Sequence, residues 1–176
     1  LLFVCNKYEP TERRVYPLRD LVVRLFGART RVTPDAVADE ELAVLDALDY
    51  RCEPHTPYQA AHLYGSAAGL DARQMTLALY LLTLAALAPA LQAFAPNDVA
   101  AAAVLLVLEF HRLQWSPSLS YWTARRPADL GVVRAALLGL WRRAHAARLQ
   151  GHSSVVTARY ADDRHFRVGE LAPPAE

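Results

Sequence analysis

The sequence predicts an all-α fold. Nearly every apolar run is rich in Leu and Ala, which favour helices, and few runs alternate with the period of two that is typical of a strand. Helix-start signals also recur along the chain, each with a Ser, Thr or Asp at the first position. The 176 residues are 53% hydrophobic and 21% charged, so the chain can form a packed core.

The first third of the chain is predicted to hold the end of one helix, over residues 1–9, and two further helices over 16–26 and 34–50. Thr33 followed by Pro34 predicts the start of the last of these, because Thr is a good N-cap and Pro suits the first helical position.

The rest of the chain is predicted to contain five longer helices and a short one. Thr56 with Gln59, and Asp71 with Gln74, have the spacing of a capping box at two helix starts. Gly27, Gly69 and Gly151 lie at or beyond probable helix ends. The predicted helices cover 57–66, 72–88, 97–113, 117–124, 128–149 and, for the short one, about 153–161.

Two segments, residues 1–5 and 99–108, are apolar around the whole helix circumference. Such a helix must be surrounded by protein, so each is predicted to be the centre of a helical bundle. Pro54, near the middle of residues 51–55, stops the preceding helix and marks the junction between the two bundles.

Two segments of the sequence bear on whether the chain contains a membrane-spanning helix or a signal peptide. Residues 74–97 carry no charge, but Pro89 interrupts the run, so we interpret it as a buried core helix rather than a membrane span. Residues 1–9 lack the pattern of a signal peptide. We interpret the chain as a fragment that starts within a buried helix.

Composition argues against several other function classes. The net charge of +1 lacks the basic excess of a dedicated nucleic-acid binder. Cys5 and Cys52 have no metal-site or disulfide spacing, which favours a reducing intracellular compartment. We therefore expect no metal, no cofactor and no catalytic site. The histidines are also scattered without zinc-site spacing: His55, His62, His111, His145, His152 and His165.

The predicted helix 128–149 carries a basic stripe. We interpret it as a solvated face, with a contact to an acidic or phosphorylated partner as the second interpretation. The stripe consists of Arg134, Arg142, Arg143 and Arg148. Three tryptophans are predicted to pack between helices: Trp115, Trp122 and Trp141.

Five stretches, taken in order, resemble the cyclin family, most closely the A/B (mitotic and S-phase) type. They are residues 6–9 (Asn-Lys-Tyr-Glu), 41–50 (Glu-Leu-Ala-Val-Leu-Asp-Ala-Leu-Asp-Tyr), 54–58 (Pro-His-Thr-Pro-Tyr), 96–108, and Ala158-Arg159-Tyr160 followed by Val168 and Pro173-Pro174.

This resemblance implies a cyclin fold with a partial first five-helix repeat and a complete second one. The expected domains are residues 1–52, the C-terminal half of the first cyclin box; 53–150, the second box; and 151–176, a C-terminal extension.

The resemblance also implies a function. The protein would be a non-catalytic regulatory subunit that binds the C helix of a cyclin-dependent kinase, activates the kinase, and forms a heterodimer with it in the nucleus and cytoplasm. No nucleic acid or membrane partner is expected. Glu41, Leu45 and Leu48 share one face of their helix, and that face would adjoin the helix that carries Lys7. The residues implied to bind the kinase are Val4, Lys7, Tyr8, Glu41, Leu45, Tyr50 and Cys52.

Two alternatives stay open from the sequence. Without the resemblance, Lys7 and Glu41 would be solvated surface residues, and Val4, Leu45, Tyr50 and Cys52 would be ordinary core. A cyclin-fold transcription or initiation factor, or a scaffold without kinase activation, is the alternative function. A basic stripe shared by both repeats would favour it, and the net charge of +1 does not.

Overall fold

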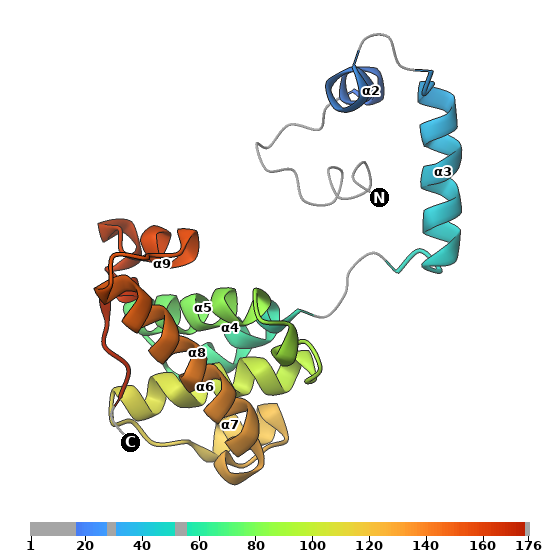
Figure 1. The fold of residues 1–176 in the computed structure, drawn as a ribbon. Coiled ribbons are helices and arrows are strands. Elements are labelled where there is room, and N and C mark those ends of the chain that lie inside the picture. The colour runs from blue at the N-terminus through green and yellow to red at the C-terminus, as the bar shows by residue number, and fades with distance from the viewer. Residues whose placement is uncertain (1–16, 28–30, 52–55, 175–176) are drawn as a thin grey trace. The chain divides into compact units, whose positions relative to one another are not determined.

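The computed structural model describes residues 17–27, 31–51 and 56–174, and the regular secondary structure within these ranges is entirely helical (Figure 1). The predicted all-α class is therefore confirmed for the described residues. The chain divides into two compact units, Leu1–Pro54 and His55–Glu176. The domain boundaries expected after residues 52 and 150 stay predictions.

The first unit contains helices α2 (Leu18–Phe26) and α3 (Pro34–Ala47), which pack against each other. The predicted N-cap of α3 is confirmed, because Thr33 Oγ1 accepts a hydrogen bond from the Ala36 N–H at 3.2 Å. The α2 helix begins two residues later than predicted, after Pro17 in the N-cap position.

The prediction that α3 continues to residue 50 is wrong. Asp49 and Tyr50 have φ angles of +53° and +55°, in the left-handed region. The Tyr50 N–H donates to the Leu45 carbonyl at 2.9 Å, which satisfies one of the free carbonyl groups at the helix end. The chain therefore turns away from the helix axis just before Tyr50.

The second unit contains a bundle of five helices and the short helix α9; within the bundle α6 lies in the centre and packs against the other four (Figure 1). Two 3₁₀ turns, η1 (Pro89–Leu91) and η2 (Pro127–Leu130), lead toward α6 and α8. The five helices are α4 (Pro57–Ala68), α5 (Ala72–Ala86), α6 (Pro96–Phe110), α7 (Pro117–Thr123) and α8 (Gly131–Leu149).

The central position of α6 follows from its composition. Every residue from 99 to 108 is buried, as the apolar circumference of this segment predicted. The four alanines at 100–103 are fully buried and their small side chains let neighbouring helices approach closely. The α5 helix is likewise a core helix. In the part of the chain that the structure describes, no helix combines the length and hydropathy that crossing a membrane requires.

The start signals of α4 and α5 form the hydrogen bonds that the sequence predicts. The Gln74 N–H donates to Asp71 Oδ1 at 2.8 Å, and the Asp71 N–H donates to Gln74 Oε1 at 3.0 Å. Thr56 and Gln59 make the same reciprocal pair. Both capping boxes are therefore confirmed, and each satisfies two backbone N–H groups at a helix start.

Two helix boundaries in this unit differ from the prediction. The α6 helix ends at Phe110 rather than residue 113, because Arg112 has a φ angle of +57° and the Leu113 N–H donates back to the Leu108 carbonyl at 2.8 Å. Before α8, residues 127–130 form a 3₁₀ turn whose start is capped by Asp129, which accepts from the Arg126 N–H at 2.8 Å.

The C-terminal segment packs on α5 and is part of the second unit. It forms the short helix α9 (Val155–Tyr160) and the 3₁₀ turns η3 (Asp163–His165) and η4 (Val168–Glu170). Its side chains reach the core: the hydroxyl oxygens of Tyr80 and Thr157 lie 3.4 Å apart, and both residues are fully buried.

Candidate functional site

The predicted contact residues on α3 lie on its most covered face. Four residues of this helix are partly buried and the others are exposed. The four are Val37, Glu41, Val44 and Leu45. Their spacing of 4, 7 and 8 residues from the first defines one side of a helix, so the structure brings Glu41 and Leu45 together on that side. This set is called the α3 face below.

Tyr50 lies just beyond the α3 face, past the end of the helix. Its side chain is 60% exposed. A hydrogen bond to the Asp46 side chain raises the pKa of the Tyr50 phenol above its usual value. The phenol therefore stays neutral at physiological pH and its ring remains available for contact. Leu48, which was predicted on the same face as Glu41, is 43% exposed.

The charge of α3 is entirely negative. The helix contains no Lys, Arg or His, and its acidic residues are Asp35, Asp39, Glu40, Glu41 and Asp46. An ionised carboxylate accepts hydrogen bonds and cannot donate them. The α3 face therefore combines one hydrogen-bond acceptor, Glu41, with apolar surface at Val37, Val44 and Leu45.

Four of the predicted contact residues lie outside the described residues. These are Val4, Lys7, Tyr8 and Cys52. The expected proximity of Lys7 to Glu41 therefore stays a prediction.

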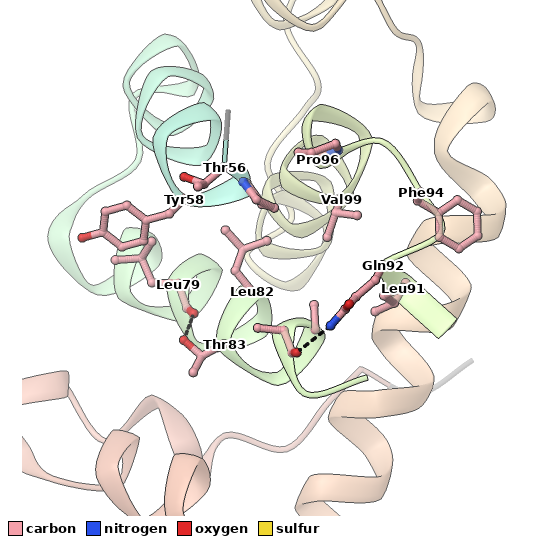
Figure 2. Close-up of a pocket in the computed structure, with 13 residues that line it drawn as sticks. Thr56, Tyr58, Leu79, Leu82, Thr83, Leu91, Gln92, Phe94, Pro96 and Val99 are labelled. Carbon is pink, nitrogen blue, oxygen red and sulfur yellow. Dashed lines mark hydrogen bonds between the residues drawn. The ribbon is translucent and has the colours of Figure 1, made fainter. Parts of the chain in front are cut away.

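An apolar groove with a volume of about 480 Å³ lies in the second unit (Figure 2). It lies between the start of α4, the second half of α5, η1 and the start of α6, and we call it the α4–α6 groove. Its lining contains no charged residue: Thr56, Pro57, Tyr58, Leu79, Leu82, Thr83, Ala85, Ala86, Leu91, Gln92, Phe94, Pro96 and Val99.

Two polar side chains of the α4–α6 groove, those of Thr83 and Gln92, already have hydrogen-bond partners within the protein. Gln92 Nε2 donates to the Ala86 carbonyl at 3.2 Å, and Thr83 Oγ1 donates to the Leu79 carbonyl at 2.7 Å (Figure 2). The groove thus offers apolar surface and no acid or base. Sequence reasoning missed it because its lining comes from four separate segments, although the charge-free stretch 74–97 supplies most of the lining residues.

No metal-binding arrangement is found in the described ranges: within them, no three His, Cys, Asp or Glu residues come close enough to hold an ion. Half of the basic stripe on α8 pairs with carboxylates of the protein itself. Arg134 pairs with Glu109 at 2.7 Å, and Arg148 lies 3.9 Å from a Glu170 carboxylate oxygen. Two of the four arginines of the stripe therefore have an acidic neighbour within the protein itself.

The three tryptophans differ in how far their side chains are buried. Trp141 is fully buried and donates its indole N–H to the Leu171 carbonyl at 3.2 Å, so its predicted packing role is confirmed. Trp115 is partly buried and packs against the core. The packing prediction for Trp122 is wrong, because α7 leaves half of this side chain, 50%, exposed.

Known proteins to which this chain is similar belong to one family. Residues 55–174 match the family model "Cyclin, C-terminal domain". The chain is 25% identical to the G2/mitotic-specific cyclin-B of Arbacia punctulata, over 97% of this chain and 41% of that protein. It is also 25% identical to the G2/mitotic-specific cyclin-B of Drosophila melanogaster, over 85% of this chain and 29% of that protein.

The chain thus spans less than half the length of these two relatives. The matched family domain begins at the boundary between the two units and includes the C-terminal segment that packs on α5. The bundle of four helices around α6 and the family match over most of the chain agree, and the chain belongs to the cyclin family.

Proposed function

We propose that this protein is a non-catalytic regulatory subunit that binds and activates a cyclin-dependent serine/threonine kinase in cell-cycle control. The family match over residues 55–174 carries this proposal. The similarity to two mitotic B-type cyclins supports the mitotic assignment. We expect the protein to act as a heterodimer with the kinase in the nucleus and cytoplasm.

The α3 face is the proposed kinase contact in the described part of the chain. Glu41 would accept hydrogen bonds from backbone N–H groups near the C helix of the kinase, and Leu45 and Tyr50 would pack against that helix. Val4, Lys7, Tyr8 and Cys52 complete the proposed contact. An aromatic side chain beside a charged pair is a common composition for an interface hot spot.

The proposed activation is a shift of population. The protein binds the kinase with its C helix turned inward, and in that state the kinase's own Lys–Glu ion pair on the phosphates can form. Because the binding energy of the α3 face is available only to that state, binding stabilises it. Every catalytic group belongs to the kinase.

Binding of single-residue variants to a cyclin-dependent kinase tests this contact. In a biolayer-interferometry measurement with the 176-residue chain, we expect Glu41→Ala or Lys7→Ala to weaken affinity by about 2–5 kcal/mol, because each change leaves a buried polar partner unpaired. Glu40→Ala is the matched control, since Glu40 is the adjacent carboxylate and lies on the exposed side of α3. Equal affinity of wild type, Glu41→Ala and Lys7→Ala would remove the contact from this face.

A second assay separates kinase activation from the alternative function. The protein should stimulate histone phosphorylation by the kinase. Strong retention on DNA at physiological salt with no stimulation would instead favour a cyclin-fold transcription factor.

A further inference from the structure

A second concavity lies between the C-terminal halves of α5 and α8, and its floor is aliphatic. Its volume is about 260 Å³, and Leu84 and Leu87 line it from one helix while Leu140 and Ala144 line it from the other. Leu87 directly follows the core helix α5, yet its side chain is 68% exposed, which is unusual for a leucine. This concavity, called the α5–α8 trough, shares no residue with the α3 face or with the lining of the α4–α6 groove.

The rim of the trough carries one cationic side chain. Arg143 on α8 lines it beside His152 from the loop after α8, and both are exposed. Of the arginines in the α8 stripe, Arg134 and Arg148 lie beside glutamates and Arg142 donates to the Pro174 carbonyl at 3.1 Å. For Arg143 the described residues supply no ion pair or hydrogen bond.

No acidic residue opposes this charge on the elements that build the trough. Residues 72–97, which include α5 and η1, contain no Asp or Glu. Residues 131–154, which include α8 and the loop to α9, contain none either. An anion placed at Arg143 and His152 would therefore meet no carboxylate from the walls, and the guanidinium group of Arg143 matches a carboxylate through two parallel hydrogen bonds.

We propose that the α5–α8 trough is a docking site for a short acidic segment of a partner protein, in which a Leu, Ile, Met or Phe side chain lies next to an Asp or Glu. The aliphatic side chain enters between Leu87 and Leu140, and the carboxylate pairs with Arg143 beside His152. The charge of the rim selects an acidic partner, and the width of the trough between two helices selects a side chain rather than a folded surface.

Selection from a phage-displayed random peptide library on the full 176-residue chain tests this docking site. We expect the retained peptides to be rich in Asp and Glu next to aliphatic or Phe residues. One retained peptide, synthesised with a fluorophore, then reports affinity by fluorescence polarisation. Arg143→Glu and Leu87→Asp should each weaken its binding roughly tenfold or more, and added salt should weaken it as well.

Two matched controls lie elsewhere on the same helices. Arg73→Glu makes the same charge change at the other end of α5, and Val132→Asp alters an aliphatic residue at the other end of α8 that is 73% exposed, nearly the same as Leu87. Both controls should change peptide affinity by roughly twofold or less. All four positions are exposed, so the variants should keep the circular-dichroism spectrum and melting temperature of the wild type.

Three outcomes would overturn the docking site: no retained peptide, retained peptides without acidic residues, or peptide binding that Arg143→Glu leaves unchanged. Self-association that Leu87→Asp abolishes, measured by analytical ultracentrifugation, would identify a second copy of the chain as the occupant instead. None of the four variants changes a residue of α3, so kinase binding should be unaffected and the two proposals fail independently.

Discussion

Helices α6 and α3 contain similar numbers of residues, 15 and 14, but they differ in how far the protein buries them. The α6 helix buries ten consecutive residues, and α3 buries none. The α6 segment is apolar on every side, so its own bundle must enclose it, whereas α3 carries five acidic residues, one of which, Glu41, lies among the apolar residues of the α3 face. The difference shows that α6 serves the stability of its unit, while most side chains of α3 are left exposed.

The largest expected effect is the loss of a buried side chain from the core of the second unit, the unit that contains α6. Trp141→Ala removes a fully buried indole and its hydrogen bond to the Leu171 carbonyl, so it should lower the free energy of unfolding by about 3–5 kcal/mol. Trp122→Ala, at a half-exposed site on α7, should cost about 1 kcal/mol or less. Urea denaturation followed by far-ultraviolet circular dichroism measures both. Similar losses for the two variants would contradict the assigned burial.

A smaller effect is expected where the C-terminal segment packs on the second unit. A Cβ at Gly169 would lie 2.5 Å from the Thr157 carbonyl oxygen and 3.0 Å from the Ala161 nitrogen, and both are backbone atoms. Gly169→Ala should therefore destabilise the unit by roughly 1–3 kcal/mol, because the backbone of η4 must move away from α9. Hydrogen exchange of residues 155–171 should accelerate in this variant.

Gly139→Ala is the control for the glycine change. Gly139 lies within α8, and the nearest atom to a new Cβ is Arg143 Nη1 at 3.5 Å, an ordinary contact with a flexible side chain. The change should raise stability by about 0.5–1 kcal/mol, since Ala favours a helix interior over Gly. If both glycine variants shifted stability in the same direction, close packing at Gly169 would not be the cause.

Changes at two helix caps test whether the two units respond separately to the same local change. Asp71→Ala removes the cap of α5 and Thr33→Ala removes the cap of α3, each at an expected cost of about 0.5–2 kcal/mol to its own helix. Asp71→Ala should lower the unfolding midpoint of the second unit. Thr33→Ala should only speed hydrogen exchange in α3. A lower midpoint for the second unit in Thr33→Ala would show that the two units unfold together.

The sequence alone determined the helical class, the order of the helices and their caps. These are local properties. Thr33, Thr56 and Asp71 each accept a hydrogen bond from a backbone N–H group three residues further along the chain. Residues 99–108 are apolar on every side of the helix, so their composition alone predicts burial. The family resemblance was also contained in five local stretches, and residues 55–174 match the cyclin C-terminal domain.

Only the tertiary structure decided which surfaces remain open. The α4–α6 groove and the α5–α8 trough each combine residues that are far apart in the chain, so no local pattern marks them. Burial of Trp141 and exposure of Trp122 likewise depend on how the second unit packs, and the end of α3 depends on two left-handed residues that the helical pattern does not reveal. Long-range packing, which periodicity along the chain does not encode, determines each of these features.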